Sequence, residues 1–87
     1  MKVKEINSIS KEDGYIYYIN RYRGNAVLEI LAKEVSIPVS FSIEINPLGQ
    51  KNIEVENLPS SLNYPVMPVK KSLKEFIDSM YSDGVLP

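Results

Sequence analysis

The stretch IPVSFSIEINPLGQKNIEVEN, residues 37–57, decides the fold. Over residues 37–45 every odd position is apolar and the intervening residues are Pro, Ser and Glu, which is the pattern of a strand with one buried face. The alternation resumes over residues 51–57, where Ile53 and Val55 are the apolar positions. The intervening Asn-Pro-Leu-Gly sequence predicts a turn, because Pro presets φ and Gly tolerates positive φ. Together these features predict an antiparallel hairpin.

The register of this hairpin follows from parity. The apolar positions are odd-numbered on both strands, so opposing residue numbers must add to an even number if both apolar sets face the same side. A five-residue loop over residues 46–50 meets this condition, and it places Ile43 opposite Ile53 and Phe41 opposite Val55. A loop shorter by one residue would turn one strand inside out.

The segment upstream of this hairpin admits two interpretations. Residues 15–22 (YIYYINRY) predict a strand, and Gly24-Asn25 predicts a tight turn because both residue types tolerate positive φ. A strand returning over residues 26–35 would then pair Ile19 with Ile30. Alternatively, Asn25 caps a helix over residues 26–35, which carry apolar residues at helical spacing. We favour the strand, and both interpretations stay open at this point.

The two ends of the chain complete the predicted domain. Residues 2–9 indicate an irregular strand with a bulge, because their apolar residues recur at every third position. Residues 58–67 contain two prolines and predict an extended crossing segment. From Pro68 an apolar stripe at helical spacing predicts a C-terminal helix, which Gly84 ends. The stripe consists of Val69, Leu73, Phe76, Ile77 and Met80.

These elements predict an α+β fold in a single domain over residues 1–87. An antiparallel β-meander of about five strands carries one amphipathic helix on one face. The chain has 87 residues, which is one small domain. It contains no membrane-spanning run of apolar residues, and no apolar stretch typical of a secretory signal follows its N-terminus. We therefore expect a cytoplasmic protein without membrane contact.

The composition argues against catalysis. The chain has neither Cys nor His, so it lacks a thiolate nucleophile, the commonest metal ligand and the usual proton-transfer group near neutral pH. Its four glycines form no phosphate-binding loop, and its acidic residues do not recur at calcium-loop spacing. We expect no enzymatic activity, no cofactor and no metal ion.

A second apolar face of the sheet is the first candidate site. If residues 15–35 form two strands, one helix covers only one face of the sheet, and the other apolar face needs a partner chain, a second copy or a covering segment. The candidate interaction residues are Tyr18, Tyr22, Val27 and Leu31. The first functional hypothesis is therefore a small non-catalytic protein-interaction or regulatory domain, which forms a homodimer through its sheet or binds another protein.

The basic residues give a second candidate site. Arg21 and Arg23 lie among the tyrosines, and Lys70, Lys71 and Lys74 occupy the first two turns of the predicted helix, against its dipole. These five residues are candidates for contact with an anion or an acidic partner. The alternative function is single-stranded nucleic-acid binding, in which tyrosines stack bases and arginines hold phosphates. The net charge of −1 makes this alternative the weaker one.

Overall fold

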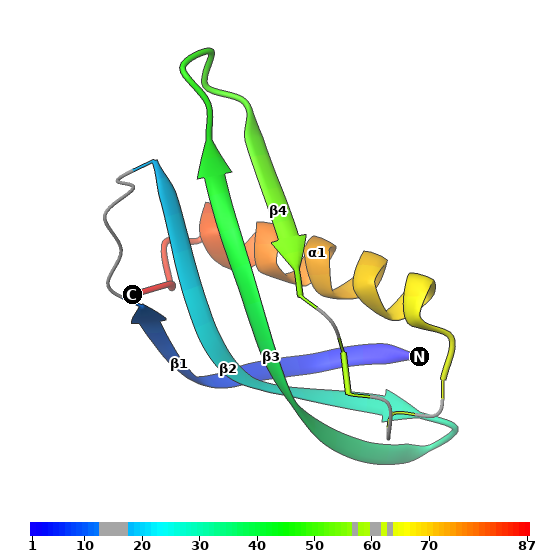
Figure 1. Ribbon diagram of the computed structural model, residues 1–87. Helices are drawn as coiled ribbons and strands as arrows, with labels where there is room; N and C mark the ends of the chain where they lie inside the picture. Colours follow the sequence, from blue (N-terminus) through cyan, green and yellow to red (C-terminus); the bar gives the residue numbers. More distant parts are fainter. Residues whose placement is uncertain (13–17, 57, 60–61, 63) are drawn as a thin grey trace.

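The computed structural model describes residues 1–12, 18–56, 58–59, 62 and 64–87. Four strands and one helix follow in chain order: β1 (Lys2–Glu12), β2 (Ile19–Ile30), β3 (Lys33–Ile45), β4 (Lys51–Val55) and α1 (Val66–Ser82). The strands form one antiparallel sheet in the order β1-β2-β3-β4, and α1 lies across one of its faces (Figure 1). The α+β meander with a C-terminal helix is thus confirmed, with four strands in the described residues against the predicted number of about five.

The core lies between α1 and the inner face of the sheet. Val69, Leu73 and Ile77 of α1 are buried, as their helical spacing predicts, and Phe76 and Met80 pack partly buried beside them. The sheet contributes the buried side chains of Val3, Ile6, Tyr22, Ala26, Leu28, Ile37, Val39, Phe41, Ile43 and Val55. Burying one large apolar side chain stabilises a fold by about 1.5–3 kcal/mol, so these contacts hold the helix on the sheet.

The β3–β4 hairpin has the predicted register. Ile43 lies opposite Ile53, and Phe41 lies opposite Val55. The apolar set of both strands therefore faces α1, as the parity of the sequence requires.

The loop of this hairpin is held by Asn46. Its side-chain oxygen Oδ1 accepts hydrogen bonds from the backbone N–H groups of Leu48 and Gln50, at 3.0 and 2.9 Å. Gly49 supplies the positive φ of 80° that the exit from the loop needs. The side chain of Leu48 points away from the protein and is 84% exposed.

The predicted turn at Gly24-Asn25 is wrong. β2 continues through both residues, which lie opposite Val39 and Pro38 of β3. The predicted pairing of Ile19 with Ile30 is wrong for the same reason, because these residues stand at the two ends of one strand.

Gly24 serves a different purpose, namely the close approach of β1. A Cβ atom at this position would lie 3.0 Å from the backbone oxygen of Asn7 and 3.2 Å from Cγ1 of Ile9. The register of β1 shifts between Asn7 and Ser10, where Ser8 has a φ of 53°. A bulge of this kind bends a strand toward its neighbour, and the missing side chain of Gly24 provides the room.

Leu31 and Ala32 form the turn between β2 and β3. Ile30 pairs with Lys33, so the loop has two residues, and their φ angles are 51° and 64°. Positive φ at both positions defines a type I′ turn, for which Asn and Gly are the favoured residues. Leu-Ala carries no such signal, which is why the sequence does not reveal the turn. Residues 26–30 are therefore strand, and the helical alternative over residues 26–35 is wrong.

The remaining predicted elements agree with the structure in part. β1 contains the predicted irregularity, and it extends through Lys11 and Glu12, which were expected in a loop. The expected strand residues 15–17 lie outside the described residues. α1 begins at Val66, so that Pro68 falls in its first turn, where the missing N–H is tolerated.

β3 runs the length of the molecule. Its 13 residues, at a rise of about 3.3 Å each, correspond to the longest dimension of 41 Å. β2 accompanies nearly all of it, whereas β4 pairs, within the described residues, only with Phe41–Ile45. Pro38 lies in the half that β4 does not reach, as its missing N–H favours. The two hairpin turns stand at opposite ends of β3 (Figure 1).

Candidate functional site

The four residues of the predicted interaction surface do not share one face. Tyr22 is only 4% exposed, and its ring stacks on that of Phe41 with centroids 5.2 Å apart. Because β2 does not turn at Gly24, Tyr22 and Leu28 lie on the same face of one strand, toward α1. The prediction that Tyr22 lies on the surface is therefore wrong, and the described residues form no second apolar face.

The other three residues of that set are dispersed. Val27 is half-buried on the outer face of the sheet, which is the face that α1 leaves open. Tyr18 precedes β2 and is 48% exposed, and Leu31 follows β2 and is 88% exposed. A 12-residue strand separates these two side chains, so they cannot belong to one small contact surface.

The outer face of the sheet is polar and carries charges of both signs. Arg23 forms an ion pair with Glu12, and Lys4 forms ion pairs with Glu34 at 3.1 Å and Glu29 at 3.9 Å. The hydrogen bond and charge of Glu34 raise the pKa of the Lys4 ammonium above its usual value. Strand register places on this face the basic residues Lys2, Arg21 and Arg23 and the acidic residues Glu5, Glu12, Glu29, Glu34, Glu44 and Glu54. The arginines therefore stand among a majority of carboxylates.

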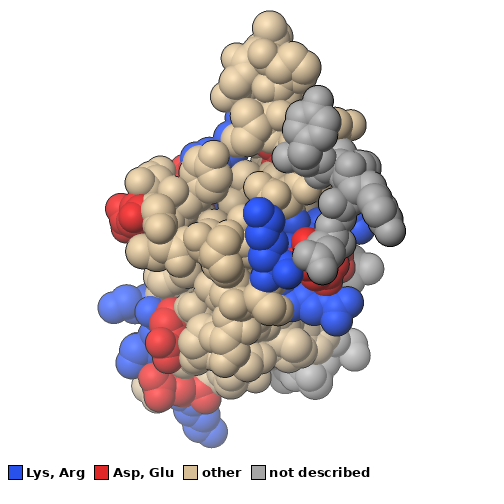
Figure 2. Space-filling model, turned by 90° about the vertical axis from the view of Figure 1, so that its left-hand side faces the viewer, with Lys and Arg blue, Asp and Glu red and all other residues tan. Residues whose placement is uncertain are grey.

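The view in Figure 2 shows the same mixture from one end. Blue and red atoms adjoin one another over the body of the molecule, whereas the projecting loop of the β3–β4 hairpin at the top carries neither colour. A nucleic-acid surface needs an excess of positive charge and exposed aromatic rings. The acidic surroundings of Arg21 and the burial of Tyr22 both weaken that alternative.

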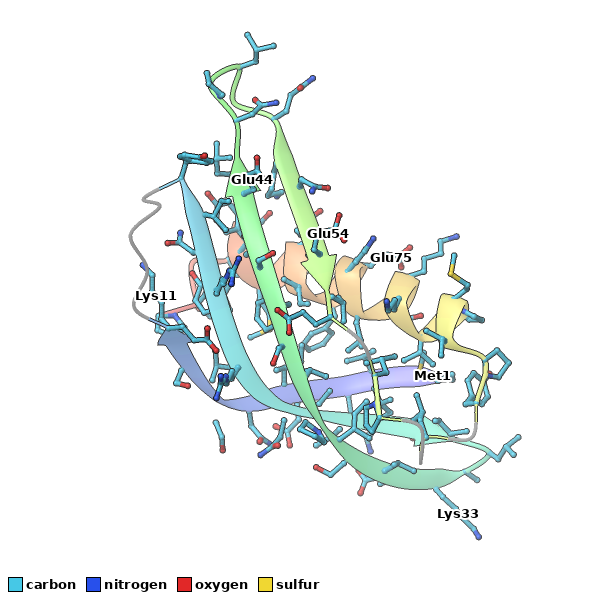
Figure 3. All side chains as sticks on the ribbon, viewed as in Figure 1. Met1, Lys11, Lys33, Glu44, Glu54 and Glu75 are labelled. Atoms are coloured by element: carbon cyan, nitrogen blue, oxygen red, sulfur yellow. The ribbon has the colours of Figure 1, made fainter. Side chains whose placement is uncertain are left out.

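The predicted basic set is divided between the two sides of the molecule. Lys70 is half-buried and Lys71 and Lys74 are exposed on α1, which covers the inner face of the sheet. Arg21 and Arg23 project from the outer face, so no single anion can contact both groups. The glutamates of the β3–β4 hairpin also lie on the outer face, away from these lysines (Figure 3).

The ion pair that joins α1 to the sheet lies elsewhere. Lys51 of β4 pairs with Asp78, and its Nζ stands 4.7 Å from the ring centroid of Tyr81. This contact fixes the C-terminal half of α1 beside the start of β4, at the end of the sheet near the Asn46 loop. The N-terminal half of α1 therefore points toward the other end of the molecule.

Exposed apolar side chains gather at that other end. Lys2 pairs with Glu29, which brings the N-terminus beside the β2–β3 turn. The start of α1 lies at the same end, as Figure 1 shows on its right-hand side. We call this group the apolar end; it consists of Met1 (38% exposed), Leu31 (88%), Val66 (46%) and Met67 (78%). Sequence reasoning identified only Leu31, and it assigned that residue to a sheet face.

Lysines surround the apolar end. Lys2 and Lys33 follow Met1 and Ala32 directly, and Lys70 and Lys71 lie one turn beyond Met67 on α1. Figure 3 shows Met1 and Lys33 on this side of the molecule. The carboxylates nearest in register to the turn, Glu29 and Glu34, already contact Lys4. The end is thus apolar at its centre and basic at its rim.

The hollows of the protein offer little chemistry. One of about 560 Å³ is lined by Pro38, Ser40, Glu56 and Pro59, so its lining supplies one hydroxyl and one carboxylate. Within the described residues no group of three or more acidic side chains is placed to hold a metal ion. In the same part of the chain, no helix is long and apolar enough to cross a membrane.

The profile of one protein family, the BB_0187 family, matches residues 1–81. The chain belongs to this family, and the match includes all four strands and α1 up to its penultimate residue. Neither a curated protein nor a solved structure matches the chain.

Proposed function

We propose that this member of the family is a small non-catalytic protein-interaction domain that binds through its apolar end. The observation that carries the proposal is Leu31, which is 88% exposed at a φ of 51°. A left-handed conformation costs about 1–2 kcal/mol for a residue with a Cβ atom. The side chain recovers little of this by burial in its own chain. Rules of local structure that are broken without compensation within the fold are typical of functional positions.

The neighbours of Leu31 support the same proposal. Met67 is 78% exposed on the first turn of α1, and Val66 beside it is 46% exposed. Single exposed apolar residues are common on proteins, whereas a group at one end supplied by separate elements is typical of a contact surface. The thioether side chain of Met67 adapts to partner surfaces of different shape.

A displayed random-peptide library selected on the immobilised full chain tests this proposal. We expect peptides that bind the wild type and fail to bind a Leu31→Ser, Met67→Ser variant. Leu48→Ser is the matched control, because Leu48 is 84% exposed in the other hairpin loop and undergoes the same chemical change. Absence of binders, or binders that the double variant retains, would contradict the proposal.

Self-association is the form of this function that needs no other protein. Light scattering over a concentration series reaching tens of micromolar measures the molar mass of the chain. A dimer that the Leu31→Ser, Met67→Ser variant converts to a monomer would make the apolar end a homodimer contact. A monomer throughout would leave another protein as the partner.

Two further expectations belong to this proposal. The cytoplasmic location predicted from the sequence is tested by fractionating cells that express the chain at its natural level. The lack of catalytic activity is supported by the side chains present, since the chain has neither His nor Cys.

A further inference from the structure

We infer that the partner of the apolar end is an acidic amphipathic peptide segment, in which carboxylates flank apolar side chains. This inference rests on the proposed function, and it assigns the class of partner from the charges around Leu31 and Met67.

The lysines of the rim lack carboxylate partners of their own. Within the described part of the chain, no ion pair joins Lys33, Lys70 or Lys71 to an acidic side chain. The first turn of α1 contains no acidic residue, and no side chain caps its N-terminus. Lysines near a helix N-terminus are disfavoured by the helix dipole, so their positive potential adds to that of the dipole. A carboxylate-bearing partner relieves this repulsion on binding.

The chain as a whole has a net charge of −1, so the basic rim is a local feature. The glutamates are concentrated on the outer face of the sheet, and the rim lysines surround the opposite hairpin end. Association of two copies through their apolar ends would bring two basic rims together, which disfavours that contact. An acidic partner has the complementary charge.

A narrow partner fits better than a broad anionic surface. Glu29 and Glu34 lie opposite each other, next to the residues that flank the Leu31-Ala32 turn. An anionic membrane that received Leu31 would also approach these carboxylates, and like charges there oppose contact. A peptide segment can contact Leu31, Met67 and the lysines while leaving the glutamates in solvent.

The experiment uses two synthetic amphipathic helical peptides with a terminal fluorophore. They share one face of Leu residues and carry either Glu or Lys on the other face. Fluorescence anisotropy with the full chain, at ~50 mM and ~300 mM salt, gives the affinity under weak and strong screening. We expect the Glu peptide to bind and to weaken as salt rises, and the Lys peptide not to bind.

Variants separate the charges from the apolar contact. Lys33→Gln, Lys70→Gln and Lys71→Gln together should weaken the Glu peptide about tenfold and flatten its salt dependence. Lys11→Gln is the matched control, because Lys11 is an exposed lysine at the other end of β1. Unchanged circular dichroism and thermal midpoint establish that the variants are folded, as substitution at exposed positions predicts.

The outcomes are distinct. Equal binding of both peptides, or full affinity in the triple lysine variant, overturns the inference. Binding to phosphatidylcholine vesicles with ~30% phosphatidylserine but not to the Glu peptide overturns it in favour of a membrane. Library peptides that need Leu31 and Met67 but carry no carboxylates refute the acidic partner and leave the proposed function standing. A library without any binder refutes the proposed function itself.

Discussion

The two turns at the ends of β3 expose leucines to the same degree and differ in every other respect. Leu48, 84% exposed, lies in a loop where Asn46 accepts two backbone hydrogen bonds and Gly49 takes the positive φ. Leu31, 88% exposed, takes a positive φ itself, in a turn without Asn, Asp or Gly. The first loop uses residues suited to reversing the chain. The second uses residues that reverse it at a cost in free energy.

The difference shows how to separate folding from binding in one small domain. In the Asn46 loop the side chains that make the turn are polar, and the exposed Leu48 is incidental to its geometry. In the β2–β3 turn the exposed Leu31 occupies a position where Asn would be more stable. Comparable exposure therefore carries different information, and backbone conformation distinguishes the two leucines.

Gly24→Ala is the substitution with the largest expected effect, because Gly24 allows β2 to continue to the Leu31 turn. The new Cβ would stand 3.0 Å from a backbone oxygen of β1, so the strands must separate. We expect a loss of about 1–3 kcal/mol in the free energy of unfolding, measured with urea. Asn25→Ala, on the opposite face, should change it by less than about 0.5 kcal/mol. Equal losses would show that close approach is not the reason for the glycine.

Asn46→Ala should disrupt the other turn. Two backbone N–H groups lose their acceptor, and we expect a loss of about 1–2 kcal/mol in the free energy of unfolding. Asn52→Ala is the control, because the Asn52 side chain donates one exposed hydrogen bond, to Glu54 at 3.3 Å. A wild-type midpoint for Asn46→Ala would remove the contrast between the two turns.

The double substitution Leu31→Asn, Ala32→Gly should sharpen that contrast by making the strained turn resemble an ordinary one. Both new residues accept positive φ, so we expect the free energy of unfolding to rise by about 1 kcal/mol. Binding of library peptides should be lost at the same time. A destabilised variant would indicate that Leu31 is held by contacts within its own fold.

The smallest effect concerns the sheet between the turns and appears at alkaline pH. Burial, with a smaller contribution from Tyr81, raises the pKa of the Tyr22 phenol above its usual value. The native state therefore keeps a proton that the unfolded chain releases, and stability should fall as pH rises above about 10. Tyr22→Phe should remove this part of the decline, while losing a 3.4 Å hydrogen bond to the backbone oxygen of Pro87. Parallel alkaline declines in both proteins would contradict the assignment.

Sequence reasoning succeeded where pattern and turn chemistry coincide. The alternation over residues 37–45 and 51–55 and the Asn46 loop point to one register, which the structure has. It failed at Gly24, because a glycine that permits a turn and one that permits close approach look alike in a sequence. The true turn at Leu31-Ala32 carries no signal at all.

The error at Gly24 also explains the fate of the predicted surface. A turn there would place Tyr22 and Leu28 on different strands, whereas one continuous strand places both toward α1. The apolar end was beyond sequence reasoning for another cause. It depends on where the start of α1 lies relative to the β2–β3 turn, and periodicity within each element holds no information about that placement.

The strand order β1-β2-β3-β4 has a consequence for how the chain folds. Each strand pairs with its neighbour in sequence, so the whole sheet forms through short loop closures, and only the return of α1 to β1 and β4 joins distant segments. Short closures are entropically favourable and are made early in folding. We expect the sheet to form before the helix docks, so that Leu73→Ala speeds unfolding in stopped-flow measurements and Phe41→Ala slows folding. On a ribosome, the sheet can thus assemble while α1 is still being synthesised.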